Sequence, residues 1–157
     1  LVTIAMIDGA VAGGATDLVL ACDFRIGSAA SSFMMPAARY GIPLYASALE
    51  RFVTRLGADQ AKRLVFLSET IDAREMQRVG VLTELVEAAR LEARVSELAA
   101  YVASIPAAPL AAIKATIMSV SRGEPVTAAT RLRLAETFQM SEIRARVDAV
   151  RAARKKS

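Results

Sequence analysis

The sequence predicts an α/β protein whose first part alternates short strands with helices and whose last part is helical. Short apolar runs bounded by glycine predict buried strands, and longer stretches with apolar residues at helical spacing predict helices. From about residue 107 only the helical pattern continues. We therefore expect an α/β core over residues 1–106 and a helical oligomerisation region over residues 107–157.

The elements expected in the first 45 residues follow from short runs and small-residue breaks. The run from Val2 to Asp8 is rich in β-branched residues and ends at Gly9, as a buried strand does. Gly41 and Pro43 break regular structure, so residues 36–44 are expected to be irregular. The expected order is a strand over 2–8, a loop over 9–14, a helix over 14–22, strands over 23–27 and 32–35, and the irregular segment.

Helices dominate the rest of the chain. Gly57 and Gly80 are natural helix stops, and Asp72 is expected to cap a helix with Glu75 as its capping-box partner. Pro109 and Pro125 suit the first turn of a helix. We expect helices over 46–56, 59–67, 72–80, 87–104, 109–123 and 125–154, and one strand over 81–86.

Composition excludes several classes of protein. Hydrophobic residues make up 54% of the 157 residues and charged residues 23%, which excludes a disordered chain. The net charge of +4 is concentrated at the C-terminus, and no aromatic residues alternate with the basic ones, so we expect no nucleic-acid partner. Lys155 and Lys156 either contact a phosphate-bearing ligand or form a solvated tail.

Cysteine and histidine usage narrows the chemistry further. Cys22 is the one cysteine, so the chain forms no internal disulfide, and no histidine is present to activate a serine or cysteine or to bind metal. We expect no metal site. No apolar stretch reaches membrane-spanning length and no signal peptide is visible, so a cytoplasmic protein with no membrane partner is expected.

The segment with the clearest chemical content is the glycine pair before the first helix. Gly13 and Gly14 let a ligand approach the backbone, and the first-turn amides are unpaired donors able to stabilise an oxyanion. Asp17 lies one turn further, where a carboxylate can move a proton or orient water. An equally weighted interpretation is tight helix packing with an acidic first turn. The spacing does not fit the glycine-rich nucleotide-binding loops.

Several spaced motifs follow one another in order along the first 86 residues. An apolar strand leads through Asp8 and Gly9 to Gly13, Gly14 and an acidic residue at position 17. The series continues to about Val86 through these segments: Ala21–Ile26, Phe33, Pro36, Gly41–Ile42, Arg51–Phe52, Arg55–Gly57, Ile71–Met76 and Val79–Val86. In this order the motifs resemble those of the crotonase superfamily, the enoyl-CoA hydratase/isomerase family. The resemblance covers the central and C-terminal portion of the family, so we expect a further segment before Leu1.

The resemblance implies a crotonase-like spiral of ββα units whose C-terminal helices assemble a homotrimer or hexamer. It also implies an acyl-CoA thioester as partner, with no separate cofactor because coenzyme A is part of the substrate. The thioester enolate would be stabilised by two backbone amides, one of them at Gly14. The acyl pocket would be lined partly by residues 34–45 and partly by residues before Leu1.

Departures from the family pattern concern the proton-transfer groups. Asp17 stands where the family has its first catalytic glutamate, and Ala37 stands where hydratases have the second. Alanine cannot transfer a proton, so an impaired CoA-thioester-binding or scaffold protein is the alternative to an enzyme. Gly14 and Asp17 are the catalytic candidates, and Gly13, Ala37, Tyr40 and Tyr45 are the substrate-binding candidates.

Two side-chain interpretations are open at this point. The hydroxyl of Tyr40 or Tyr45 either orients water or the substrate, or simply points into solvent. Glu50 and Arg51 are expected to form a solvated helix face.

Overall fold

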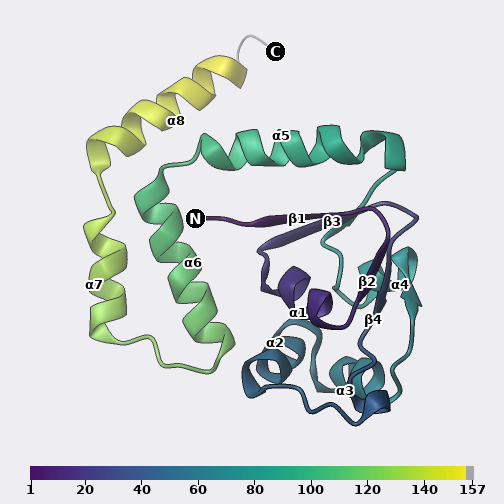
Figure 1. Ribbon diagram of the computed structural model, residues 1–157. Coiled ribbons are helices and arrows are strands. Elements are labelled where there is room, and N and C mark those ends of the chain that lie inside the picture. The colour runs from purple at the N-terminus through teal and green to yellow at the C-terminus, as the bar shows by residue number, and fades with distance from the viewer. Residues whose placement is uncertain (155–157) are drawn as a thin grey trace. The chain divides into compact units, whose positions relative to one another are not determined.

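The computed structural model describes residues 1–154 and divides into two compact units (Figure 1). The first unit ends at Ile105 and the second begins at Pro106. Among the described residues, no single helix is long and apolar enough to cross a membrane. The consecutive helical stretches Ala88–Ala103 and Ala107–Ser121 reach the required length and apolar composition only when they are counted together.

The first unit holds two three-stranded sheets, and the chain passes back and forth between them. One sheet has the order β1 (Ile4–Ile7), β3 (Phe24–Gly27) and β6 (Glu84–Leu85), all parallel. The other has the order β2 (Ala10–Ala12), β4 (Ser32–Met34) and β5 (Ile71–Asp72), with β5 antiparallel to β4. Each successive strand pair therefore contributes one strand to each sheet, and the first two pairs are each followed by a helix, which repeats a ββα pattern.

Three strand predictions need correction. The predicted loop over residues 9–14 contains β2, whose Val11 is buried and lies opposite Phe33 of β4. Its neighbours are alanines and glycines, so local propensity gave no strand pattern. The two-residue strand β5 was not predicted. The strand expected over 81–86 is shortened to β6, with Val81 and Leu82 buried before it.

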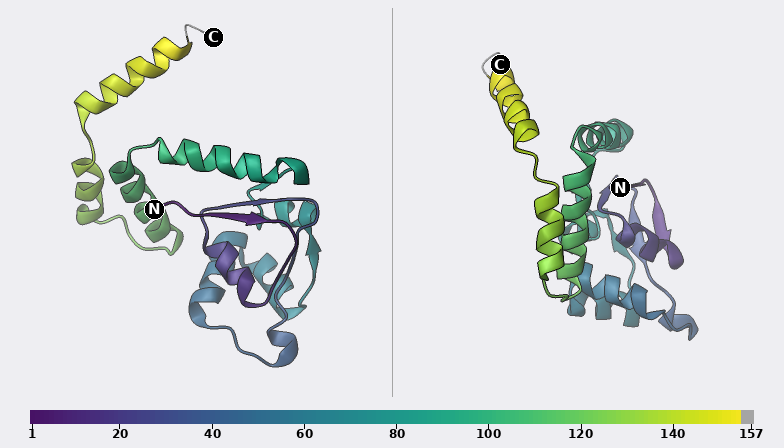
Figure 2. Two further views of the ribbon diagram at one scale, coloured as in Figure 1. Left: turned by 45° about the horizontal axis from the view of Figure 1, so that its top comes forward. Right: turned by 90° about the vertical axis from the view of Figure 1, so that its left-hand side faces the viewer.

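Five α-helices complete the first unit. They are α1 (Gly14–Ala21), α2 (Ala46–Leu56), α3 (Ala58–Phe66), α4 (Ala73–Arg78) and α5 (Leu91–Ala103), with short 3₁₀ turns at Ala38–Tyr40 and Ala88–Arg90. The helix expected over 87–104 thus begins with a 3₁₀ turn. Helix α5 runs alongside β1 and β3, while α1 and α2 pack against each other (Figure 2). The core includes the Phe33 and Phe52 rings, whose centroids are 6.0 Å apart.

The predicted cap of α4 is present in part. The Asp72 carboxylate accepts a hydrogen bond from the Glu75 amide at 2.9 Å, as an N-cap does. The Glu75 carboxylate, however, pairs with Arg63 and Arg78. It therefore ties α4 to α3 rather than completing a capping box.

The second unit contains α6 (Ala107–Ser121), α7 (Ala128–Glu136) and α8 (Met140–Arg154), and α6 and α7 lie side by side (Figure 1). The single helix expected over 125–154 is wrong. Thr127, not Pro125, starts α7, because its hydroxyl accepts a hydrogen bond from the Thr130 amide at 3.2 Å. Helix α7 then ends at Thr137, whose hydroxyl donates to the Leu134 carbonyl at 2.8 Å.

Candidate active site

Parallel pairing of β2 and β4 determines where the candidate site forms. Ala12 lies opposite Met34 in the register, so the chain leaves both strands at the same edge of the sheet. The residues that follow, Gly13–Gly14 and Met35–Ala37, therefore come together although they are far apart in sequence. The Gly13 amide donates to the Met34 carbonyl at 3.1 Å and extends the pairing by one residue.

An open pocket of about 280 Å³ lies at this edge of the sheet. It brings together all six residues that the sequence singled out. The lining residues are Gly13, Gly14, Asp17, Met35, Pro36, Ala37, Tyr40, Ile42, Pro43, Leu44 and Tyr45. Most of these side chains are apolar, and the polar groups are confined to the two tyrosines, Asp17 and the glycine backbone.

The glycine pair presents its backbone to open space. Gly13 has φ 58° and ψ −130°, a conformation that side-chain-bearing residues rarely adopt. Its carbonyl accepts hydrogen bonds from the Thr16 amide at 3.0 Å and the Thr16 hydroxyl at 2.6 Å. A Cβ added at Gly13 or Gly14 would meet no heavy atom within 4 Å. Among residues 1–154 the Gly14 amide has no acceptor, so it remains a free donor at the start of α1.

Asp17 is fixed by two side chains from the segment around α2. Arg51 donates from Nε to Oδ1 at 2.6 Å and from Nη2 to Oδ2 at 3.2 Å, and Tyr45 donates its hydroxyl to Oδ2 at 2.5 Å. The Asp17 side chain is only 10% exposed. The prediction that Arg51 belongs to a solvated face is therefore wrong. The spacing contained a sign of this, because Arg51 lies one turn after the buried Ala48.

The hydrogen bonds from Arg51 and Tyr45 determine the protonation state of Asp17. The hydrogen bond from Arg51 lowers the pKa of Asp17, and Tyr45 adds to the effect, against burial, which raises it. The hydrogen bond to Asp17 in turn raises the pKa of Tyr45 and of Arg51. At neutral pH the three groups are a carboxylate, a phenol and a guanidinium. Asp17 is therefore an acceptor and not a proton donor.

The remaining predicted residues shape the opposite wall. Ala37 is buried and contributes only a methyl group, while its carbonyl accepts from the Tyr40 and Ile42 amides at 3.1 and 2.9 Å. These bonds turn the segment back toward the pocket. Tyr40 stands on the rim and is 69% exposed. The wall that residues 35–45 provide is thus mainly apolar, which suits a hydrocarbon chain.

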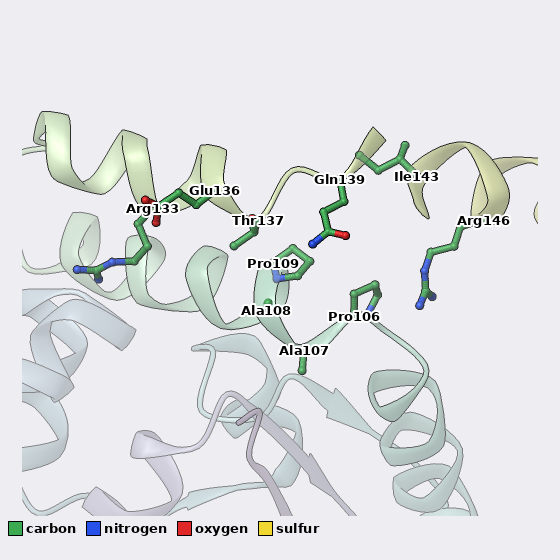
Figure 3. Close-up of a pocket in the computed structure, with 10 residues that line it drawn as sticks. All are labelled: Pro106, Ala107, Ala108, Pro109, Arg133, Glu136, Thr137, Gln139, Ile143 and Arg146. Carbon is green, nitrogen blue, oxygen red and sulfur yellow. The ribbon is translucent and has the colours of Figure 1, made fainter. Parts of the chain in front are cut away.

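A second pocket, of about 440 Å³, lies within the second unit. Residues from the start of α6, the end of α7 and the first half of α8 surround it (Figure 3). Arg133 and Arg146 lie at opposite ends of the opening and do not point toward each other. The side chains of these two arginines therefore do not form one joint binding site in this pocket. The phosphate contact considered for Lys155 and Lys156 falls outside the described residues.

Curated relatives act on coenzyme A thioesters. The chain is 31% identical over 120 residues to a short-chain-enoyl-CoA hydratase of Clostridium acetobutylicum, covering 76% of this chain and 45% of that protein. It is 32% identical over 133 residues to an enoyl-CoA isomerase/hydratase of Mycosarcoma maydis, covering 84% and 47%. A methylmalonyl-CoA decarboxylase of Escherichia coli is 28% identical over 111 residues, covering 71% and 42%. The chain spans about half the length of these relatives.

Solved structures agree on the fold. An enoyl-CoA hydratase/isomerase family protein from Hyphomonas neptunium superposes with a TM-score of 0.80 at 24% identity, over 86% of this chain and 52% of that one. An enoyl-CoA hydratase from Thermobifida fusca, solved with acetoacetyl-CoA, gives a TM-score of 0.76 at 28% identity, over 92% and 56%. The predicted crotonase-like fold class is confirmed.

The sequence profile of the enoyl-CoA hydratase/isomerase family matches residues 1–153, nearly the whole chain. The match extends past the last strand and includes the helices of the second unit. With the ordered motifs, the ββα repeat and the shared fold, it establishes that this chain belongs to the enoyl-CoA hydratase/isomerase family.

Proposed function

We propose that the pocket at the start of α1 binds the thioester group of an acyl-CoA and stabilises its enolate. The observation that carries this proposal is the free Gly14 amide, which opens onto an apolar pocket beside a fixed carboxylate. The thioester oxygen would accept from Gly14, and the acyl chain would lie against residues 35–45. The acetoacetyl-CoA complex of the Thermobifida fusca relative supports a ligand of this class.

The physical advantage lies in where negative charge develops. When a thioester becomes an enolate, its oxygen gains charge, and a donor already oriented at a helix start needs no reorganisation to meet it. Removal of one such donor typically costs about 100- to 1000-fold in kcat. The family resemblance implies that a second backbone amide also donates to this oxygen.

The state of Asp17 limits the reaction this chain can support. An ionised carboxylate held by Arg51 can accept a hydrogen bond from water or substrate but cannot supply a proton at neutral pH. Ala37 offers no proton either. The residues present therefore do not support hydration by two cooperating carboxylates. A reaction that depends mainly on enolate stabilisation is the better candidate.

Ala37 and the Asp17–Arg51 ion pair favour a second function, which is a catalytically impaired protein that binds CoA thioesters or acts as a scaffold. Calorimetry with acetoacetyl-CoA, together with turnover assays on a panel of enoyl-CoA thioesters, separates the two functions in the full-length protein. Tight binding without turnover would favour the catalytically impaired binding protein. If the protein neither binds acetoacetyl-CoA nor turns over any of these thioesters, both CoA-thioester functions are rejected.

The Gly14 amide can be tested by a matched pair of substitutions. Gly14→Pro removes the N–H at a first helical position that tolerates proline, whereas Gly14→Ala keeps the N–H. In either variant the added Cβ meets no heavy atom within 4 Å beyond its chain neighbours and the backbone of its own helix. We expect Gly14→Pro to lower kcat by about 100-fold or more and Gly14→Ala to retain most activity. Equal losses in both variants would contradict a role for the amide.

A further inference from the structure

The ion pair between α1 and α2 has one of its two partners in the pocket. Asp17 lines the pocket, whereas Arg51 does not line it and contacts the Asp17 carboxylate from α2. Tyr45 approaches from the segment just before α2 and lines the pocket itself. Asp17 thus lines the pocket and is at the same time held in place by Arg51 of α2.

The hydrogen bonds from Arg51 and Tyr45 limit how many further hydrogen bonds the Asp17 carboxylate can accept. An ionised carboxylate offers about four acceptor positions. Arg51 and Tyr45 fill two on Oδ2, and Arg51 fills one on Oδ1. One position remains, on Oδ1. A bidentate guanidinium also fixes the plane of the carboxylate, so this last position has a fixed direction.

We propose that Arg51 is a positioning residue that holds Asp17 as an oriented carboxylate, leaving one acceptor position of Oδ1 for a water molecule or for an O–H or N–H group of the bound ligand. This inference rests on the proposed function, since it assumes that the pocket binds an acyl-CoA. It adds that Asp17 acts in a single protonation state and that α2, through Arg51, sets that state.

The other groups around Asp17 do not replace Arg51. Strand β2, which also packs against α1, has no titratable side chain. On α2 and the segment before it, Tyr45 donates to the carboxylate and Glu50 acts electrostatically on Arg51. Tyr40 stands on the rim of the same pocket. Within the described residues, the one cation paired with Asp17 is therefore Arg51.

A purely structural ion pair between α1 and α2 would predict something different. If Arg51 only joined the helices, its loss would lower stability and change ligand affinity equally at every pH. If it sets the state of Asp17, its loss leaves a buried carboxylate that protonates more readily as the pH falls. Ligand binding would then acquire a pH dependence that the wild type lacks.

The test uses the full-length protein and acetoacetyl-CoA, with dissociation constants measured by calorimetry from roughly pH 4 to pH 8. The ratio of variant to wild-type Kd at each pH cancels the titrations of the coenzyme itself. For Arg51→Gln we expect this ratio to rise on the acid side by about 2- to 12-fold, the range for one lost hydrogen bond. Arg51→Lys, which keeps a cation, is expected to reduce the rise.

Two further variants identify the titrating group. Asp17→Asn in the Arg51→Gln background removes the carboxyl, so the ratio is expected to become independent of pH. Arg55→Gln, an equivalent change one turn along α2, is the matched control and is expected to give no acid-side rise. A flat profile for Arg51→Gln, or a rise that persists without the Asp17 carboxyl, would overturn the inference while leaving thioester binding intact. A wild type that does not bind acetoacetyl-CoA would instead reject the proposed function.

Discussion

Gly13 and Gly14 are adjacent, yet the structure requires glycine at only one of them for the fold. Gly13 has a positive φ of 58°, whereas Gly14 begins α1. Gly13→Ala should therefore lower the free energy of unfolding by about 1–3 kcal/mol, the cost of a sparsely populated backbone conformation. Gly14→Ala should leave it unchanged or raise it slightly, because alanine favours helices. Urea unfolding of both variants checks this, and equal destabilisation would contradict it.

Ser68 combines two unfavourable features at one residue. It is a non-glycine residue with a positive φ of 51°, and it is buried. Its hydroxyl oxygen has no hydrogen-bond partner among the described residues. Left-handed backbone costs a non-glycine residue about 1–2 kcal/mol, and a buried unpaired hydroxyl costs a similar amount.

Ser68→Gly should therefore raise the free energy of unfolding by about 1 kcal/mol, after subtraction of the extra chain entropy that glycine loses. Ser68→Ala removes the hydroxyl but keeps the Cβ, so it should give a smaller gain. The midpoint of urea unfolding measures both. A loss of stability in Ser68→Gly would mean that the strain at this position is absent in solution.

Single residues differ in how far sequence alone locates them. The six candidate site residues follow motif spacings, and β2–β4 pairing brings them into one pocket. Arg51 was missed because a charged helix residue usually faces solvent, and only its contact with Asp17 identifies it. The backbone of Ser68 depends on the tertiary path of the chain between α3 and β5, for which no local pattern exists.

At the scale of elements, α3 and α4 are joined by a cluster of charges. Arg63 pairs with both Glu69 and Glu75, and Arg78 donates to Glu75 at 2.5 and 2.6 Å. The hydrogen bonds from Arg78, and next those from Arg63, lower the pKa of Glu75 to about 2 from an ordinary value of 4.5. The cluster therefore stabilises the fold only while Glu75 is ionised.

The sign of the pH effect follows from this depressed pKa. The contribution of Glu75 is fully present above about pH 4.5 and is lost as the pH falls toward about 2. Glu75→Gln should therefore reduce the slope of unfolding free energy against pH in this window. Urea unfolding at a series of pH values measures the slope, with Glu92→Gln at the exposed start of α5 as control. An unchanged slope in Glu75→Gln would show that the cluster is open in solution.

Elements were predictable where the local pattern was long enough. Helix α2 matches its predicted range of 46–56, because Gly57 and an apolar stripe at Ala48, Phe52 and Leu56 define it. The strands β2 and β5 were missed because they are short and their stability comes from pairing with β4, which is distant in sequence. The break between α7 and α8 was missed because Thr137 ends α7 through a hydrogen bond that many threonines do not make.

At the scale of the whole molecule, the helices of the second unit leave many apolar side chains exposed. On α6, Ile113, Ile117 and Val120 form one stripe at helical spacing and are 48%, 59% and 52% exposed. A stripe of this kind is costly in water. We propose that a second copy of the protein covers it, in the homotrimer or hexamer that the family resemblance implies.

Sedimentation of the full-length protein should therefore give a mass of three or six chains, and a change on the α6 stripe should lower it. Ile117→Glu places a charge in the middle of the stripe, where burial against another copy would be strongly unfavourable. Ala115→Glu places the same charge on the opposite face of α6 and serves as control. A monomeric wild type would contradict self-association. If Ala115→Glu dissociates the assembly and Ile117→Glu does not, the subunit contact lies on the opposite face of α6. That result would contradict the proposal, because the apolar stripe would remain exposed to solvent in the assembly.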